Sequence, residues 1–181
     1  MFKRFSVEEN VSSTSNVKNS VQRGIQSQIM SQYPVIAPII EQIIPKKSIQ
    51  LAKCTDHIQL VLLNNEVIFF NQRDGPFFPS LRTLHKYPDM MPKMQVDKGA
   101  IRFVLGGANI MCPGFTSPGG SLPTVLDIDT PVAIYAEEKR HALAVGITKM
   151  STDKIMELNK GVAVENAHFL LDGLWINHII S

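Results

Sequence analysis

The sequence has little cysteine and no long hydrophobic run. Cys54 and Cys112 lie far apart, and each falls in an apolar segment, which favours free, buried thiols in a reducing compartment. There is no CxxC motif and no cysteine–histidine cluster, so we expect no zinc site. No stretch approaches the ~20 apolar residues that a helix needs to cross a membrane. These absences predict a soluble, cytoplasmic protein that uses no metal or other cofactor and does not bind a membrane.

The motifs of common catalytic sites are also missing. The chain contains no nucleophile elbow, no HExxH sequence, no P-loop and no glycine fingerprint for dinucleotides. Asp127 and Asp129 lie close enough in sequence to resemble a catalytic carboxylate pair, but no basic or metal-binding partner accompanies them. A solvated loop is the favoured interpretation. We therefore expect no catalytic residues and no enzymatic activity.

The net charge is small, and it is unevenly distributed. The 181 residues carry a formal charge of +2. Residues 1–92 contain ten Lys/Arg against seven Asp/Glu, whereas residues 93–181 contain eight against nine. A mildly basic chain of this kind does not by itself indicate nucleic-acid binding. Any phosphate contact in the second half has to come from a local cluster of cations.

Hydrophobic periodicity predicts that the first half is an antiparallel sheet with helices packed against it. Val17, Val21, Ile25 and Ile29 recur every four residues, which is typical of an amphipathic helix over residues 16–33. The other expected elements are a polar loop over 8–15, a helix over 35–45, strands over 49–54, 57–63 and 66–70 with a two-residue turn at 64–65, and a short helix capped by Ser80.

A stiff segment bracketed by prolines separates this half from the next. Pro88 and Pro92 lie on either side of Asp-Met-Met, and each proline disfavours helix or central strand. We place the domain boundary here, with one domain over residues 1–92 and a second over residues 93–181.

Residues 94–114 predict a strand–helix–strand unit at the start of the second domain. Met94 and Val96 alternate as in a strand, and Asp97 stands at the helix N-cap position. Gly106–Gly107 ends the helix over 100–105, because glycine enters the left-handed region without a Cβ penalty. The other expected elements are strands over 109–112, 132–136, 141–148, 162–164, 168–171 and 174–176, and a helix over 151–159 that Gly161 closes. Short strands with two small helices fit a β pseudo-barrel, so the expected fold class is α+β.

Two sequence motifs in this second domain resemble the opening of the PUA domain, an RNA-binding module. The motifs are Val96-Asp97-x-Gly99-Ala100 and Gly107-Ala108-x-x-x-x-Pro113-Gly114. The resemblance implies that RNA lies along the first helix and the glycine turn after it. Gly106 stands where PUA domains commonly carry a larger, often basic residue.

Four further motifs resemble the malignant T-cell-amplified sequence family of translation factors, and they occur in that family's order. They are Gly75-Pro-Phe-Phe-Pro79, Leu84-His-Lys-Tyr-Pro88, Thr116-Ser-Pro-Gly119 and His168-x-x-x-Asp172-Gly-Leu-Trp175. The resemblance implies an N-terminal domain before a C-terminal PUA pseudo-barrel. It also implies a non-enzymatic factor that binds ribosomal RNA of the small ribosomal subunit together with a density-regulated partner protein. Such a pair supports translation reinitiation and ribosome recycling with release of deacylated tRNA, so tRNA is a further expected partner.

Two groups of residues are candidates for contacts with these partners. Lys98 and Arg102 are four residues apart, so they share one helix face beside the glycine turn, where cations and a bare backbone suit phosphates. A second basic cluster opens the strand after residue 140, although a solvated hairpin tip explains it equally well. The candidate RNA-binding residues are Lys98, Arg102, Gly106, Gly107, Ala108, Lys139, Arg140 and His141.

Four phenylalanines in irregular segments are candidates for protein–protein contact, because aromatic anchors dominate tight interfaces. They are Phe2, Phe5, Phe77 and Phe78. The alternative is that these rings cover the protein's own sheet. Two other functions also stay open: an RNA-binding accessory factor for RNA modification, and a protein-interaction scaffold.

Overall fold

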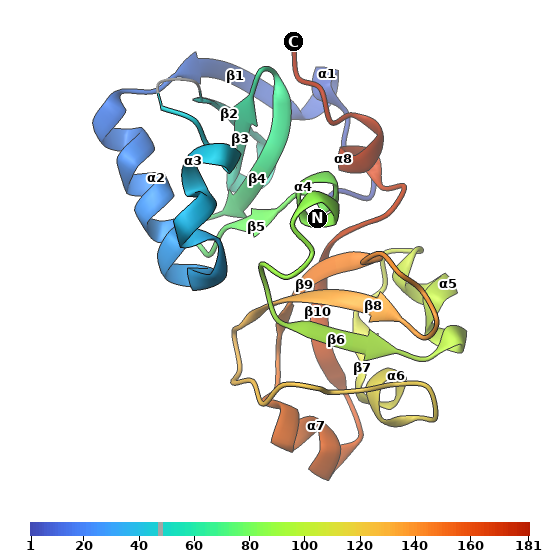
Figure 1. The fold of residues 1–181 in the computed structure, drawn as a ribbon. Coiled ribbons are helices and arrows are strands. Elements are labelled where there is room, and N and C mark those ends of the chain that lie inside the picture. Colours follow the sequence, from blue (N-terminus) through green and yellow to red (C-terminus); the bar gives the residue numbers. More distant parts are fainter. Residues whose placement is uncertain (47–48) are drawn as a thin grey trace. The chain divides into compact units, whose positions relative to one another are not determined.

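The computed structural model describes residues 1–46 and 49–181, and it contains two compact units (Figure 1). The N-terminal unit consists of Phe5–Met90 and Ile176–Ser181, and the C-terminal unit of Met1–Arg4 and Met91–Trp175. The helices in the described part of the chain are too short or too polar to cross a bilayer.

The N-terminal unit contains a five-stranded sheet in the order β1-β2-β3-β4-β5, in which every neighbouring pair is antiparallel. Asn64 and Asn65 join β3 to β4 with φ values of 50° and 65°, as a primed turn requires, so that prediction is confirmed. The strands are β1 (Val11–Asn16), β2 (Ile49–Cys54), β3 (Ile58–Leu63), β4 (Glu66–Gln72) and β5 (Phe78–Pro79).

Helices pack beside this sheet (Figure 1). Ile25 and Ile29 of α2 are buried, and the side chains of Gln22 and Gln26 donate hydrogen bonds to carbonyls just after α3, which ties the two helices together. Ser80 caps α4 as predicted. The helical segments are α1 (Val7–Asn10), α2 (Asn19–Gln32), the 3-10 helix η1 (Pro34–Ile39), α3 (Ile40–Ile43), the 3-10 helix η2 (Thr55–His57) and α4 (Leu81–Lys86).

The prediction of a polar loop over residues 8–15 is wrong. These residues form the end of α1 and most of β1, which pairs with β2 from Val11↔Cys54 to Asn16↔Gln50. β1 is an edge strand, and its residues are exposed except for the partly buried Val11. A strand that buries neither face has no reason to alternate apolar and polar residues, so its sequence looks like a loop.

The C-terminal unit contains a curled five-stranded sheet in the order β6-β8-β9-β10-β7. β6 and β8 are parallel, and the other pairs are antiparallel. Its core includes Met94, Val96, Ile134 and Phe115, each at most 2% exposed. The elements are β6 (Lys93–Val96), the 3-10 helix η3 (Lys98–Ala100), α5 (Ile101–Val104), β7 (Ile110–Met111), α6 (Cys112–Thr116), β8 (Pro131–Ala136), β9 (Ala144–Thr148), α7 (Thr152–Leu158), β10 (Val162–Phe169) and α8 (Gly173–Ile176).

Several predicted boundaries in this unit are corrected. One strand, β10, replaces the two expected over 162–164 and 168–171, and the expected strand over 174–176 is the helix α8. The strand expected over 109–112 is only Ile110–Met111, and Cys112 begins the helix α6, where Pro113 stands in the first turn and its missing N–H costs nothing. Asn159, with φ 47°, is the C-cap of α7 in place of the expected closure at Gly161. The predicted α+β class, with a pseudo-barrel after an antiparallel sheet, is confirmed.

Both ends of the chain depart from the division expected at residues 92 and 93. Phe2 and Ile180 are buried, at 0% and 2% exposed. In the C-terminal unit the N–H of Gly173 donates to the carbonyl of Phe2 over 2.8 Å. In the N-terminal unit the N–H of Val67 donates to the carbonyl of His178 over 2.9 Å. The N-terminal residues are therefore held in the C-terminal unit, and the C-terminal residues in the N-terminal unit, by burial and backbone hydrogen bonds.

Candidate nucleic-acid interface

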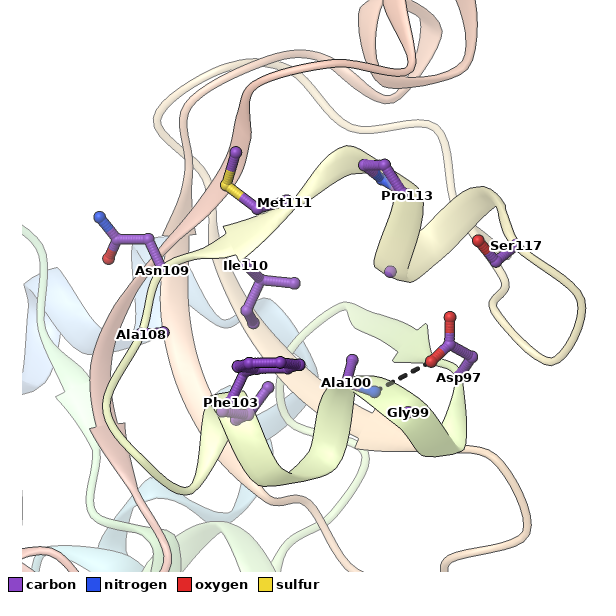
Figure 2. A pocket seen from close by; sticks show the side chains of 12 residues that line it. Asp97, Gly99, Ala100, Phe103, Ala108, Asn109, Ile110, Met111, Pro113 and Ser117 are labelled. Atoms are coloured by element: carbon purple, nitrogen blue, oxygen red, sulfur yellow. Dashed lines mark hydrogen bonds between the residues drawn. The ribbon is translucent and has the colours of Figure 1, made fainter.

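A pocket of about 610 Å³ opens on the C-terminal unit between α5 and the β7–α6 segment (Figure 2). Its wall is mainly apolar, and the polar side chains at its edge belong to Asp97, Asn109 and Ser117. Figure 2 shows Phe103 pointing from α5 toward Ile110 of β7. A concave apolar surface with a few polar groups is the usual form of a ligand site. The other lining residues are Gly99, Ala100, Val104, Ala108, Met111, Pro113 and Gly114.

The helical wall of this pocket is fixed at both ends by its own sequence. Asp97 accepts a hydrogen bond from the N–H of Ala100 over 2.9 Å, so the predicted N-cap is confirmed. At the other end the N–H of Ala108 donates to the carbonyl of Phe103, and that of Gly107 donates to Val104, each over 3.0 Å. This pair of bonds is a Schellman motif, and it places Gly107 in the left-handed region with φ 88°. The glycine turn is thus a well-defined backbone surface.

A side chain from β10 holds the same turn from beneath. The Asn166 amide donates to the carbonyl of Val104 over 3.1 Å and to that of Ala108 over 3.2 Å. The backbone N–H of Asn166 donates to the Asn109 side chain over 3.1 Å. Since these groups join the end of α5 to the sheet, the wall of the pocket is preorganised for binding.

Phe103 brings an aromatic ring to the pocket, with 56% of its surface accessible. The Arg102 guanidinium lies 4.8 Å from the centre of this ring, within cation–π distance. Met111, 48% exposed, adds apolar surface across the pocket. A flat ring next to a cation can stack on a nucleobase while the cation contacts its phosphate.

A salt bridge connects the first predicted cation cluster to the loop that carries the second. The Lys98 ammonium lies 2.6 Å from a carboxylate oxygen of Glu138, in the loop between β8 and β9. Hydrogen bonding and charge attraction from Lys98 lower the pKa of Glu138, and Glu138 raises the pKa of Lys98 in return. The contribution of this ion pair to the stability of the folded unit is present at neutral pH. It is lost as the pH falls through the lowered pKa of Glu138 or rises through the raised pKa of Lys98.

The predicted RNA-binding residues lie on the surface of the C-terminal unit. Lys98 and Arg102 are exposed at the start and middle of the helical segment, and Gly106, Gly107 and Ala108 form the turn after it. The residues of the second cluster are exposed in the β8–β9 loop, next to the glutamate that binds Lys98; they are Lys139, Arg140 and His141.

The four phenylalanines predicted to contact a partner are buried in this structure, between 0% and 7% exposed. Phe2 contacts the ring of His168 edge-on in the C-terminal unit. In the N-terminal unit Phe78 stacks on Phe70 with ring centres 5.3 Å apart, and the backbone of Phe77 bonds to Gln32. The rings cover the protein's own core, as the alternative interpretation proposed, and in this conformation they offer no surface to a partner. The remaining ring, Phe5, is 7% exposed in the N-terminal unit.

The described residues contain no group of three histidine, cysteine or acidic side chains that could hold a metal ion. Cys54 and Cys112 are free thiols, and burial raises the pKa of Cys54 to about 11. At neutral pH such a thiol is almost wholly protonated, so it is a weak nucleophile.

Comparisons with known proteins agree with this architecture. The Pre-PUA-like domain matches residues 5–88 and the PUA domain matches residues 92–170. Malignant T-cell-amplified sequence 1-A of Xenopus laevis is 54% identical over 176 residues, which cover 97% of each chain. The chain belongs to the malignant T-cell-amplified sequence family. Malignant T-cell-amplified sequence 2 of Homo sapiens is 52% identical over 176 residues, again 97% of each chain.

Solved structures similar to this family member share its fold. A hypothetical protein from the archaeon Pyrococcus horikoshii superposes with a TM-score of 0.74 at 22% identity, over 92% of this chain and 99% of that one. A conserved PUA domain protein from Thermoplasma acidophilum gives a TM-score of 0.66 at 20% identity, with the same coverage.

Of the residues that line the pocket, sequence reasoning named only Ala108 as a site residue, and it missed Phe103, Asn109 and Met111 among others. One signal could have identified Phe103. Ala100, Ile101 and Val104 form the apolar face of the helix, and Phe103 lies off that face. An aromatic residue on the solvent side of a short helix, directly next to the predicted cation Arg102, is a candidate for stacking on a base.

Proposed function

We propose that this member of the malignant T-cell-amplified sequence family is a non-enzymatic, RNA-binding translation factor. The observation that carries the proposal is the exposed Phe103 ring in an apolar pocket, with the Arg102 cation beside it. Unpaired bases stack on exposed aromatic rings, and cations next to them bind the connecting phosphates. Asp97 and Asn109, at the edge of the pocket, are suited to hydrogen bonds with the edges of a base.

The resemblance of the motifs to the family supports a ribosomal setting for this activity. The proposed target is ribosomal RNA of the small subunit, bound together with a density-regulated partner protein, and tRNA is a second RNA ligand. The pair would support reinitiation and the release of deacylated tRNA after termination, which is ribosome recycling. The mechanism is positional: this chain holds RNA, and its partner reaches the decoding region. Such work takes place in the cytoplasm.

Sedimentation with purified small ribosomal subunits, with and without the partner protein, tests the proposal. The informative variant is Phe103→Ala, and the matched control is Met156→Ala, which removes a side chain 61% exposed on α7 in the same unit. Loss of a base stack worth ~1–3 kcal/mol predicts a five- to 150-fold weaker association for Phe103→Ala. Equal binding by both variants would show that the pocket is not part of the RNA interface.

Binding to free structured RNA and to the partner protein, measured beside the sedimentation, separates the two other functions. Equally tight binding to free structured RNA and to subunits would favour an accessory factor for RNA modification. Binding to the partner protein with no salt-sensitive affinity for RNA would favour an interaction scaffold, since contacts to phosphates release counterions and weaken with salt.

A further inference from the structure

The first residues of the chain lie on the C-terminal unit, where a fixed set of contacts holds them. Phe2 is fully buried, with its ring centre 5.9 Å from that of His168 at an interplanar angle of 81°. The N–H of Gly173 donates to the Phe2 carbonyl over 2.8 Å. Both the side chain and the backbone of Phe2 are therefore anchored, so the backbone position from which Lys3 extends is fixed.

The surface beneath Phe2 is itself held rigidly. His168 Nδ1 lies 2.8 Å from Oδ2 of Asp172, and both side chains are at most 1% exposed. Asp172 also accepts hydrogen bonds from the N–H of Phe169 over 3.0 Å and from that of Trp175 over 2.9 Å. Because these bonds fix the end of β10 and the start of α8, Phe2 packs on a preformed site.

Lys3 follows this anchor and lies over the glycine turn. A methyl group placed on Gly107 would be 3.4 Å from Cδ of Lys3 and 3.1 Å from Cε1 of Phe169. The aliphatic stem of Lys3 thus covers the bare backbone of Gly107, next to Ala108 at the edge of the pocket. Lysine stems commonly pack on apolar surface in this way while the ammonium stays in water.

The ammonium of Lys3 is available for a ligand. Lys3 is exposed, and it forms no ion pair with any residue that the structure describes. Its neighbours differ, because Lys98 is paired with Glu138 and Arg102 lies on the Phe103 ring. The glycine turn carries no charged side chain of its own, so Lys3 supplies the positive charge there.

We propose that Lys3 is an RNA-contacting residue, which supplies a phosphate-binding cation at the glycine turn although it lies about a hundred residues earlier in the sequence. The proposal rests on RNA binding at the neighbouring pocket, and it adds a residue that the sequence does not place there. A phosphate that follows a base stacked on Phe103 can approach the turn at Gly106, which is exposed and has no side chain, while Lys3 covers Gly107. The Lys3 ammonium then contacts that phosphate from the far side of the turn.

Variants of the full chain test this assignment by binding to small ribosomal subunits across a salt series. Lys3→Met keeps the stem and removes the charge, Lys3→Arg keeps the charge, and Lys160→Ala removes an exposed cation elsewhere on the same unit. Loss of one phosphate contact lowers the slope of log affinity against log salt by roughly one, or about four- to six-fold in affinity near 0.15 M salt. We expect this loss for Lys3→Met, retained binding for Lys3→Arg, and no comparable change for Lys160→Ala.

The outcomes distinguish this proposal from the function on which it rests. If the unaltered protein binds subunits and Lys3→Met has the same affinity and slope as Lys160→Ala, the role of Lys3 is refuted and the RNA-binding function stands. If Lys3→Arg binds as weakly as Lys3→Met, the charge is not what matters, and the assignment is again refuted. Absence of any RNA or subunit binding by the unaltered protein overturns both.

Discussion

Replacing Phe2 by alanine tests whether the first residues are an integral part of the C-terminal unit. The ring of Phe2 is fully buried against His168, and its backbone accepts a hydrogen bond from Gly173. The substitution removes the ring and leaves that backbone bond possible. We expect Phe2→Ala to destabilise this unit strongly, although the residue lies only one position from the start of the printed sequence.

The expected magnitude follows from the complete burial of the side chain. Truncating a buried phenylalanine to alanine costs ~3–5 kcal/mol, which combines lost apolar burial with the cavity left behind. Residues 1–4 can move away from the unit once their anchor is gone, and this relaxation limits the loss. We therefore expect a decrease of about 3 kcal/mol in the free energy of unfolding, near the lower end of that range.

Urea denaturation followed by the fluorescence of Trp175 is a suitable assay. Trp175 is the single tryptophan of the chain and lies in the C-terminal unit, so its signal reports on that unit. Phe103→Ala is the matched control, since it removes the same side chain from a site 56% exposed. Its effect on stability should be small, within about 0.5–1 kcal/mol. The two variants should thus affect different properties: Phe2→Ala should lower the stability of the unit, and Phe103→Ala should lower its affinity for RNA.

A change of less than about 1 kcal/mol for Phe2→Ala, or one equal to that of Phe103→Ala, would refute the reasoning. It would mean that the segment is not packed in solution as the structure has it, and the position of Lys3 over Gly107 would lose its support.

Three other predictions concern charge, thiol reactivity and chemistry. Glu138→Gln breaks the salt bridge to Lys98 and removes a negative charge near the pocket. The affinity for RNA at low salt should therefore rise about two- to five-fold in a salt titration. An unchanged affinity would argue against Lys98 as an RNA contact. Cys54, with a pKa of about 11 against an ordinary 9.0, should react with iodoacetamide at pH 8 about 10-fold more slowly than a free cysteine peptide, because the smaller thiolate fraction outweighs the greater nucleophilicity of that thiolate. A comparable rate by mass spectrometry would contradict its burial. Incubation with unmodified tRNA or ribosomal RNA should yield no new nucleoside by mass spectrometry, and any modified base that depends on the protein would overturn the non-enzymatic assignment.

Elements that depend on local chemistry were predictable from the sequence. Asn64–Asn65 forms the expected primed turn, and Ser80, Asp97 and Ser151 cap the expected helices. Each depends on residues within a few positions of one another, so the sequence contains all the necessary information. The glycine turn after α5 belongs to the same class, since Gly107 takes the positive φ that favours glycine.

Features that depend on distant contacts were not predictable. β1 forms because β2 offers it a ladder of hydrogen bonds, and nothing in its polar sequence reveals that partner. Phe2 and the other aromatic residues in irregular segments looked available to a partner, since burial by remote parts of the chain leaves no local pattern. The candidate site shows both limits. The helix and turn were predicted, but the opposite wall, α6, begins at Cys112, which was expected to end a strand, and Lys3 comes from a distant part of the sequence.

The exchange of the chain ends between the two units has a consequence for synthesis on the ribosome. Residues 5–90 emerge early, but the backbone bonds that residues 176–181 donate and accept at the β3–β4 hairpin can form only after the C-terminal unit has been translated. Residues 1–4 must likewise wait, with the Phe2 side chain exposed, until β10 and α8 exist to cover it. The N-terminal unit therefore cannot reach its full set of contacts until residues 176–181 have been made, by which point the whole C-terminal unit has also been translated.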